Sequence, residues 1–409
     1  MTLSTIISGW GNYPKQKSQI AIPPSSVKLK TIITQERSLI ARGMGRSYGD
    51  SANASNVLQT SYCDHFVEFD DKTGMLIVEA GITLREVLKL IVPKGWFLPV
   101  TPGTSYVTLG GAIASDVHGK NHHTAGTFGQ YVKSLRIALG TGEVVTASPS
   151  ENMDLFHATC GGMGLTGVIL STTIQLIPIR SSLINQKTIK ADCIEAACEA
   201  FEENNNTTYS VAWIDCLAKG KNLGRSVLIL GEHAESGGLD LGIKDPISVP
   251  FNTPSALLNS VTMKIFNSAY WYKAKHKQTQ TLPLMTYFYP LDSIGSWSKL
   301  YGKNGFLQFQ CVIPKDDGVA NMRKLLTEIT ESGEGSLLAV LKQFGKANDN
   351  LLSFPTEGYT LALDFKLTAS AITTLHRLEE IVVNMGGRVY LTKDAVMQEA
   401  TFKATYPRW

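Results

Sequence analysis

Four glycine-rich segments between residues 41 and 168 constrain this chain more than any other feature of its sequence. Glycine lacks a Cβ, so the backbone amides of such a segment can approach an anion to hydrogen-bond distance. One glycine-rich loop is usually an ordinary turn, but four of them predict a large phosphorylated cofactor that is contacted from several sides. The segments are 41–50 (ARGMGRSYGD), 102–123 (PGTSYVTLGGAIASDVHGKNHH), 125–129 (AGTFG) and 160–168 (CGGMGLTGV).

The common nucleotide-binding motifs do not account for these segments. The chain contains no G-x-x-x-x-G-K-[ST] sequence, which excludes a P-loop. Residues 43–48 partly match the G-x-G-x-x-G fingerprint, with Tyr48 where the third glycine would stand. The residues that follow are a poor start for a helix, so a Rossmann site is disfavoured.

Composition excludes several other classes of protein. The 409 residues are 43% hydrophobic and 18% charged, which is typical of a globular protein with two or three domains. A net charge of +3 without a basic run argues against a nucleic-acid partner. We expect no transmembrane helix and no secretory signal, because no apolar stretch has the required length or flanks. The six cysteines form no C-x-x-C pair, which predicts free thiols in a reducing compartment.

The first part of the chain, residues 1–180, is rich in predicted strands. Its short β-branched runs are bounded by glycine, aspartate or asparagine, as strands usually are. Residues 83–95 (TLREVLKLIVPKG) instead predict a helix with one apolar face, which ends at Pro93 and Gly95. We expect this part to form the cofactor-binding domain.

The second part of the chain contains two strand–helix–strand units within residues 305–392. Helices are expected near 317–332 and 369–385. The pattern predicts an α+β fold, in which a second domain of antiparallel sheet covered by helices spans 181–387. Residues 388–409 then return to complete the first domain.

Several of these motifs resemble a known flavoprotein superfamily. The segments ARGMGRSYGD, PGTSYVTLGGAIASDVHGKNHHTAGTFG and GGMGLTGV are similar to the PCMH-type FAD-binding domain of the vanillyl-alcohol oxidase/para-cresol methylhydroxylase superfamily. The branch of decaprenylphosphoryl-ribose 2-oxidases is the most similar, since YFYPLD, GFLQFQCVIP, LSFP, GRVYLTKD and TYPR resemble its second domain. The resemblance implies oxidation of a ribose 2-hydroxyl, the first half of an epimerisation to arabinose in cell-wall biosynthesis.

The resemblance places FAD against the glycine-rich segments. Loop 43–48 and segment 102–112 would hold the pyrophosphate, residues 118–120 would lie beside the isoalloxazine ring, and the glycines of 160–168 would flank the adenosine. Relatives that bind flavin covalently have a histidine where this chain has Arg46, so we expect non-covalent FAD. The residues expected to contact FAD are Arg42, Gly43, Met44, Gly45, Arg46, Ser47, Pro102, Gly103, Thr104, Thr108, Gly110, Gly111, Ala112, Ser115, Gly119, Asn121, Ala125, Gly162, Gly164, Gly167 and Tyr390.

The implied reaction converts an alcohol to a ketone, with a base that accepts the hydroxyl proton. Lys393 in LTKD matches an active-site lysine of the family and would be that base; otherwise it is a solvated charge at a strand end. His118 would orient the substrate or relay the proton, or else be a histidine satisfied by backbone in a tight turn. Tyr48 would pack beside the flavin or sugar, or else in the core. His122 and His123 have no cysteine or carboxylate at ligand spacing, so no metal site is expected.

Seven residues are expected to bind the substrate. Gln308 and Gln310 alternate along a predicted strand, so both point to one face and suit a polyhydroxylated sugar. Lys120 and Lys342 would contact a substrate phosphate, although each is otherwise an ordinary surface lysine. The other three depart from the family pattern: Phe288, Thr360 and Ala362 stand where relatives have tyrosine, asparagine and cysteine. We therefore expect the flavin chemistry to be retained, but not necessarily the identical substrate.

The segment 246–275 is apolar and aromatic, with interruptions at proline and asparagine. It is expected to admit a polyprenyl tail or to rest on a bilayer; the alternative is ordinary domain core. The expected protein is cytoplasmic, at most peripheral on the inner membrane, with a short-chain reductase as pathway partner. Two alternatives stay open: a soluble sugar-alcohol or aldonolactone oxidase on the same scaffold, and a flavin-binding protein without turnover.

Overall fold

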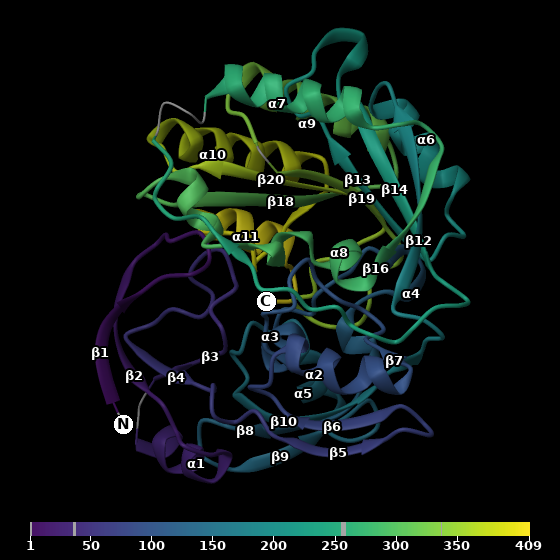
Figure 1. The fold of residues 1–409 in the computed structure, drawn as a ribbon. Helices are drawn as coiled ribbons and strands as arrows, with labels where there is room; N and C mark the ends of the chain where they lie inside the picture. The colour runs from purple at the N-terminus through teal and green to yellow at the C-terminus, as the bar shows by residue number, and fades with distance from the viewer. Residues whose placement is uncertain (1, 36–37, 255–258, 337) are drawn as a thin grey trace.

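A computed structural model describes residues 2–35, 38–254, 259–336 and 338–409 (Figure 1). Smaller sheets from the first part of the chain lie at one end of the molecule, and a large helix-covered sheet lies at the other. The fold is mixed α+β with mainly antiparallel sheets, as predicted. No helix in the described parts of the chain is long and apolar enough to cross a membrane. All six cysteines have free thiols.

The described N-terminal residues form a four-stranded sheet in the order β1-β2-β4-β3. β1 pairs antiparallel with β2, whereas β2 and β3 pair parallel with β4. Leu29 and Ile33 of α1 pack with Leu58 of β4 in a small core beside this sheet. The glycine-rich loop 43–48 follows β3 directly, so the sheet fixes where that loop begins. The bounds are β1 Thr2–Ile7, β2 Gln16–Ala21, α1 Ser26–Gln35, β3 Ile40–Arg42 and β4 Asn56–Gln59.

A five-stranded antiparallel sheet, β5-β6-β10-β8-β9, forms the base of the first part among the described residues. The helix predicted for 83–95 is present as α2, followed by a 3-10 turn that ends at Gly95 with φ +81°. The Thr83 side chain caps α2 by accepting a hydrogen bond from the Glu86 amide at 3.2 Å. The buried residues of α2 (Leu84, Val87, Leu88 and Ile91) join the core that also holds α3.

The bounds of the elements in this part are β5 Phe66–Asp70, β6 Met75–Glu79, α2 Leu84–Ile91, β7 Trp96–Phe97, α3 Leu109–Ala114, α4 His122–Ala125, β8 Val132–Ala138, β9 Val144–Ala147, α5 Met153–Thr159, β10 Val168–Gln175 and β11 Ile177–Pro178. The short α3 and α4 connect the glycine-rich residues 102–129 to this sheet.

The large sheet of the described residues has eight antiparallel strands in the order β16-β12-β14-β13-β19-β20-β18-β21. Helices α6, α9 and α10 cover one face, and α9 and α10 match the two predicted helices. On β18, Leu307 and Phe309 pack under these helices, so Gln308 and Gln310 point to the opposite face, as the alternation predicted.

The strands of this second part are β12 Leu183–Ala191, β13 Tyr209–Ile214, β14 Ser226–His233, β15 Ile247–Ser248, β16 Gln278–Pro283, β17 Ile294–Gly295, β18 Phe306–Pro314, β19 Ala339–Phe344, β20 Gly358–Lys366 and β21 Arg388–Val389. Its helices are α6 Ile194–Glu203, α7 Ser260–Lys273, α8 Leu284–Phe288, α9 Gly318–Ser332, α10 Ala369–Asn384 and α11 Glu399–Thr405. Of the apolar segment predicted at 246–275, residues 255–258 lie outside the described residues.

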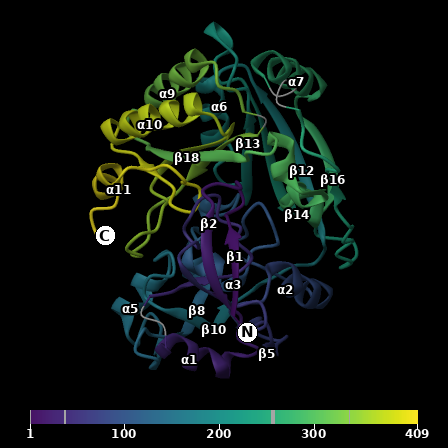
Figure 2. The ribbon, with the colours of Figure 1, turned by 90° about the vertical axis from the view of Figure 1, so that its left-hand side faces the viewer.

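Segments from the early and the late parts of the chain come together between the two groups of sheets. Figure 2 shows β1 and β2 reaching toward β18, and the Phe306 amide donates to the carbonyl of Gly11 at 2.8 Å. Beyond β21, the carbonyl of Thr392 accepts a hydrogen bond from the Tyr48 amide at 2.9 Å. The hydroxyl of Tyr390 donates to the carbonyl of Ser115 at 3.1 Å. Residues 390–394 therefore join the large sheet to the glycine-rich loops.

Candidate active site

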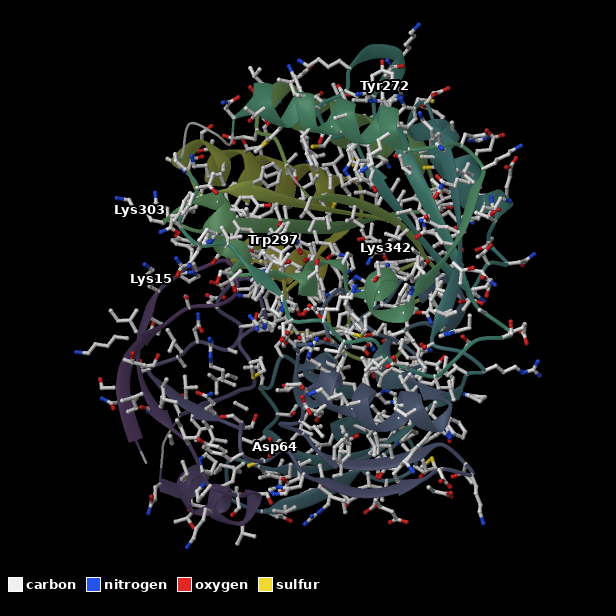
Figure 3. All side chains as sticks on the ribbon, in the orientation of Figure 1. Lys15, Asp64, Tyr272, Trp297, Lys303 and Lys342 are labelled. Carbon is white, nitrogen blue, oxygen red and sulfur yellow. The ribbon has the colours of Figure 1, made fainter. Side chains whose placement is uncertain are left out.

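A cavity of about 700 Å³ lies where the glycine-rich loops face the large sheet. Figure 3 shows Lys342, one of its lining residues, in the middle of the molecule. Loops 43–48 and 101–104 and residues 117–120 form one wall, and β18, β19 and residues 390–393 form another. The expected site residues that line it are Gly43, Met44, Gly45, Arg46, Ser47, Tyr48, Pro102, Gly103, Thr104, Thr108, Gly110, Gly111, Ser115, His118, Gly119, Lys120, Gly164, Gly167, Phe288, Gln308, Gln310, Lys342, Ala362, Tyr390 and Lys393.

Three lysines face this cavity without an acidic partner. Lys120, Lys342 and Lys393 line it, and none of them forms an ion pair within the described residues. Burial lowers the pKa of Lys120 to about 7 and of Lys342 to about 8. Burial and then the charge of Lys342 also lower the pKa of Lys393, to about 7. The cavity therefore has three lysines that no ion pair neutralises, which suits an anionic ligand.

The glycines leave bare main chain as part of the cavity surface. A Cβ on Gly103 would meet no atom within 4 Å, so this residue borders open space. A Cβ on Gly43 would lie 2.2 Å from Thr108 Oγ1, and one on Gly110 would lie 2.9 Å from the Cβ of Ala80. These loops therefore pack as they do only because the positions are glycine. Exposed backbone amides along these loops suit the two phosphates of a dinucleotide.

Lys393 lies against Tyr48 and near a buried carboxylate. Its Nζ is 3.9 Å from the centre of the Tyr48 ring. The carboxylate of Asp364, on β20, accepts hydrogen bonds from Gln308 Nε2 at 2.5 Å and from the Tyr301 hydroxyl at 3.1 Å. Burial raises the pKa of Asp364 to about 6, and Asp364 in turn opposes the lowering of the Lys393 pKa. Lysine, carboxylate and amide therefore form one buried polar group.

Asp364 was not among the residues expected at the site. An aspartate in the middle of the apolar strand YTLALDF is a signal that sequence reasoning missed, because a buried carboxylate needs partners. Two of its partners, Trp297 and Tyr301, lie on a 3-10 helix of five residues, which is too short to show a periodicity in the sequence. Neither partner was predicted to belong to the site.

His118 lines the cavity and packs against aromatic rings and one amide. Gln310 Nε2 lies 3.0 Å from His118 Nε2, and because an amide NH₂ donates, the imidazole proton resides on Nδ1. Nδ1 has no hydrogen-bond partner within the described residues. Burial, and then the charge of Lys342, hold the pKa of His118 well below its usual range. The ring is therefore neutral. The surrounding rings belong to Phe344, Phe354 and Tyr390.

The neighbouring polar residues of this loop are engaged by protein. His122 Nδ1 accepts a hydrogen bond from the Gly345 amide at 3.1 Å, and His123 Nε2 contacts the carbonyl of Thr207 at 2.8 Å. Lys120 Nζ donates to the carbonyl of Tyr287 and lies 4.1 Å from the centre of that ring. Within the described residues no group of three histidine, cysteine or acidic side chains is arranged to hold a metal ion.

Three polar residues expected at the site point elsewhere. The Arg42 guanidinium donates to Asn53 Oδ1 at 2.6 Å and to the carbonyl of Ser8 at 2.7 Å, so it braces the loop and lines an adjoining pocket instead of the cavity. Asn121 Nδ2 donates to the carbonyl of Pro99 at 2.8 Å. The Thr360 hydroxyl donates to the carbonyl of Cys311 at 2.8 Å and accepts from the amide of Gln310, which covers it.

Three small residues expected to touch FAD also do not line the cavity. Ala112 is fully buried in the core on α3. Ala125 packs at the edge of the same core. A Cβ on Gly162 would lie 1.9 Å from the carbonyl oxygen of Ala158, so this glycine permits backbone packing behind the site. These residues support the loops that line the cavity.

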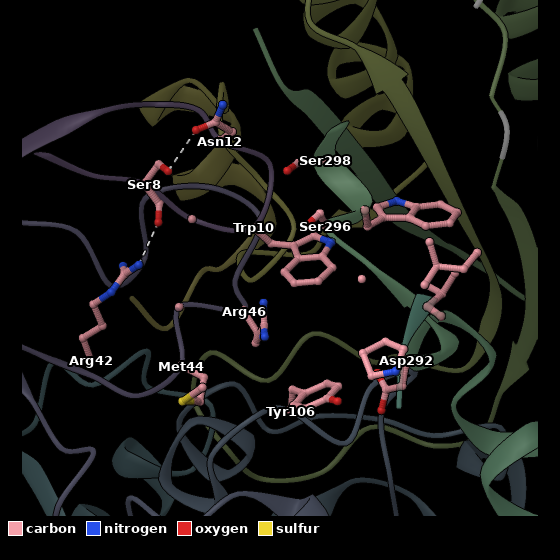
Figure 4. Close-up of a pocket in the computed structure, with 17 residues that line it drawn as sticks. Ser8, Trp10, Asn12, Arg42, Met44, Arg46, Tyr106, Asp292, Ser296 and Ser298 are labelled. Carbon is pink, nitrogen blue, oxygen red and sulfur yellow. Dashed lines mark hydrogen bonds between the residues drawn. The ribbon is translucent and has the colours of Figure 1, made fainter. Parts of the chain in front are cut away.

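A second pocket of about 480 Å³ adjoins the cavity and shares part of its lining (Figure 4). Figure 4 shows Arg46 between two rings, and its guanidinium carbon lies 4.3 Å from the centre of Trp10 and 5.5 Å from that of Tyr106. Arg46 Nε has no hydrogen-bond partner within the described residues. The nearby Asp292 instead accepts from the amide and hydroxyl of Ser105, at 2.8 and 2.6 Å. Sequence reasoning had not singled out Trp10, Tyr106 or Asp292.

Comparison with known proteins identifies what this architecture is similar to. Residues 27–148 match the model of the FAD binding domain family. The chain is 35% identical to decaprenylphosphoryl-beta-D-ribose oxidase of Mycolicibacterium smegmatis, covering 100% of this chain and 92% of that protein. It is 30% identical to an uncharacterized protein of Streptomyces coelicolor, covering 80% of this chain and 92% of that protein. It is 22% identical to L-gulono-1,4-lactone dehydrogenase of Mycobacterium tuberculosis, covering 98% of this chain and 93% of that protein.

These matches agree with the glycine-walled, lysine-lined cavity, and the FAD-binding match includes the loops at 43–48 and 102–120. The first two relatives are matched over most of their own length, so the similarity is not restricted to the FAD-binding segment. The chain belongs to the PCMH-type family of FAD-dependent oxidoreductases that includes decaprenylphosphoryl-beta-D-ribose oxidase, and FAD is its cofactor.

Proposed function

We propose that this enzyme oxidises the 2-hydroxyl of a polyprenylphosphoryl pentose, such as a lipid-linked ribose, to a ketone. The observation that carries the proposal is the convergence of three lysines without ion-pair partners and two strand-borne glutamines on one cavity. Lysine cations suit a phosphate and glutamine amides suit a sugar, so a ligand that carries both a phosphate and a sugar would contact both sets of side chains. The similarity over the full chain to an enzyme named for such a substrate supports this choice.

The cofactor would be held by main chain and not by a covalent bond. Loop 43–48, residues 102–104 and the turn at Thr108–Gly111 would hold the pyrophosphate, and His118 with Gly119 would lie beside the isoalloxazine ring. FAD supplies a hydride acceptor at N5 when bound. Arg46 stands where covalent attachment would need a histidine, and its cationic guanidinium is not a nucleophile.

Lys393 would accept the hydroxyl proton of the substrate. A general base works best when its pKa is near the working pH, and burial lowers the Lys393 pKa to about 7. Asp364 accepts a hydrogen bond from Gln308, and its charge keeps the pKa of Lys393 from falling further. It would therefore position Gln308 and tune Lys393 without touching the substrate itself. Tyr48 packs under the lysine side chain and restricts where its amine can lie.

The sugar and its phosphate would be bound mainly by side chains of β18 and β19. Gln310 orients His118, and the two present a donor and an acceptor to the sugar hydroxyls. Lys342 is the better candidate for the phosphate, because Lys120 already donates to the carbonyl of Tyr287. The small side chain of Ala362 on β20 and the apolar ring of Phe288 complete the lining.

The larger organisation follows from the same proposal. Residues 1–180, completed by 388–409, would be the cofactor-binding domain, and 181–387 the substrate-binding domain. The ketone formed is a substrate for a reductase, and a short-chain reductase would complete the epimerisation. We place the enzyme in the cytoplasm, in contact with the inner membrane where its lipid-linked substrate resides.

Anaerobic stopped-flow absorbance tests the proposal directly. The yellow holoenzyme is mixed with polyprenylphosphoryl ribose, with free ribose or with an aldonolactone, and bleaching of the flavin is followed. We expect the lipid-linked sugar to bleach the flavin at least about tenfold faster than either other compound. Faster bleaching by the lactone would overturn the substrate and favour an aldonolactone oxidase. No bleaching by any of the three would favour a flavin-binding protein without turnover.

A further inference from the structure

Helix α7 presents an apolar face to solvent. Val261, Ile265 and Tyr272 are 63%, 65% and 77% exposed, and their spacing of four and seven residues puts them on one side of the helix. Figure 1 places α7 on the outside of the molecule, at the end opposite β5 and β9. Large apolar side chains aligned on one exposed helix face are unusual in a soluble surface and mark a contact surface.

The inward face of α7 is held by a buried polar anchor. Met263, Asn267 and Trp271 are the buried residues of the helix. Asn267 Nδ2 donates to Asp215 Oδ1 at 2.8 Å, and Asp215 also forms an ion pair with Arg225 at 2.8 Å. The helix is therefore fixed in rotation by specific hydrogen bonds. This orientation leaves Val261, Ile265 and Tyr272 on the outward side.

The charge around α7 selects the kind of partner. Residues 246–291 contain no aspartate and no glutamate. Lys264 and Lys273 on the helix, and Lys275 and Lys277 directly after it, are exposed. A helix with an apolar stripe flanked by lysines is the pattern of peptides that lie in the interface of an anionic bilayer.

The same helix also reaches the cavity. Phe266 and Tyr270 line the cavity, and Phe266 is next to Ile265 of the exposed stripe. We propose that α7 docks this protein on an anionic lipid bilayer, with Val261, Ile265 and Tyr272 inserted among the lipids and the four lysines at the headgroups. The docking does not depend on which sugar the enzyme oxidises.

Flotation of the holoenzyme with lipid vesicles tests this docking. Vesicles of phosphatidylcholine alone are compared with vesicles that also contain phosphatidylglycerol, at low and high salt. We expect binding to the anionic vesicles, and at least about tenfold less binding to the neutral ones or at high salt. I265S/Y272S should lower the fraction bound by at least about tenfold, since two inserted apolar side chains are lost.

Matched variants separate insertion from general surface effects. I6S/V27S changes two equally exposed apolar residues far from α7, which are 68% and 81% exposed, and should bind anionic vesicles as the wild type does. K264Q/K273Q/K275Q should lose binding while keeping the flavin spectrum and the melting temperature. Neither α7 variant should slow flavin reduction by a detergent-dispersed substrate.

Three outcomes would overturn the proposal. The wild-type holoenzyme could remain at the bottom of the gradient with anionic vesicles. I265S/Y272S could float as well as the wild type. The wild type could sediment as a dimer in solution and I265S/Y272S as a monomer, which would assign the stripe to a second copy of the chain. Failure of the substrate assignment would appear only in the flavin-bleaching experiment and would leave these results unchanged.

Discussion

The amine of Lys393 lies 3.9 Å from the centre of the Tyr48 ring, and the Tyr48 amide donates to the carbonyl of Thr392, the residue before that lysine. The ring and the hydrogen bond come from the same residue, so the position of the amine depends on loop 43–48. The same loop lines the cavity expected to hold FAD. Cofactor binding and the placement of the proposed base are therefore linked through one residue.

Lys393→Ala should bind FAD but reduce it slowly. We expect flavin reduction at least about a hundredfold slower than in the wild type, because a positioned base contributes that much or more. Lys393→Arg should be equally slow, since a guanidinium stays protonated. Anaerobic stopped-flow absorbance gives the rates, and the visible spectrum reports FAD binding. A wild-type rate in either variant would rule out Lys393 as the proton acceptor.

The rate of flavin reduction should rise with pH through about 7, the value to which burial lowers the Lys393 pKa. Above that pH the amine is neutral and can accept a proton, whereas below it the amine is already charged. The rate should therefore reach a plateau on the alkaline side. Single-turnover rates at saturating substrate between pH 5.5 and 9 check this, using roughly half-unit steps. A rate that falls as pH rises would contradict the assignment.

Asp364→Asn should move that inflection to lower pH. The Asp364 carboxylate raises the pKa of Lys393, so removing its charge leaves burial and Lys342 to lower it further. Asparagine is nearly isosteric, which limits the structural cost in this hydrogen-bonded cluster. Asp292→Asn is the control, because Asp292 contacts Ser105 and does not act on Lys393. An unchanged inflection in Asp364→Asn would show that the two groups are not coupled.

Lys342→Met should stabilise the apoenzyme while weakening substrate binding. Burial lowers the Lys342 pKa from 10.5 to about 8, so below about pH 8 the folded protein carries a desolvated charge that the unfolded chain hydrates. The free-energy cost of this buried charge is constant below about pH 8, where Lys342 is protonated in both the folded and the unfolded state. The cost falls to zero between pH of about 8 and 10.5, as first the folded protein and then the unfolded chain loses the proton. The free energy of unfolding of the variant should exceed that of the wild type by on the order of 1–3 kcal/mol at pH 6, and by less at pH 9. Thermal unfolding at both pH values measures this, and KM for the phosphorylated substrate should rise.

Acid denaturation should release all of the flavin. The Arg46 guanidinium is not a nucleophile and cannot form a covalent bond with the flavin, so precipitation should leave a white pellet and a yellow supernatant. Absorbance of the two fractions measures the distribution, and chromatography of the supernatant should identify intact FAD. Yellow colour that stays with the precipitated protein would contradict non-covalent binding.

The parts of the site that sequence predicted are those with a local signal. Alternation on β18 placed Gln308 and Gln310 on the cavity face, and glycine spacing located the loops that line it. Arg42 shows where local reasoning ends: it adjoins the loop in sequence, yet its guanidinium reaches back to Ser8 and Asn53.

Thr360 and Asp364 show the effect of long-range contacts. Thr360 shares a strand face with Ala362, but the Gln310 side chain on the neighbouring strand covers it. Asp364 acquires its role from Trp297 and Tyr301, which come from a short 3-10 helix far away in sequence. No pattern of spacing on one strand reports which remote loop will pack against it.

The separation in sequence between loop 43–48 and residues 390–393 has a consequence for biosynthesis. Both line the same cavity, but the loop is made some time before residues 390–393. A nascent chain that has not yet reached Tyr390 should therefore present the glycine-lined loops as an open surface. We expect flavin to be captured only after residues 390–393 have been made, and a premature stop before Tyr390 should yield a colourless product.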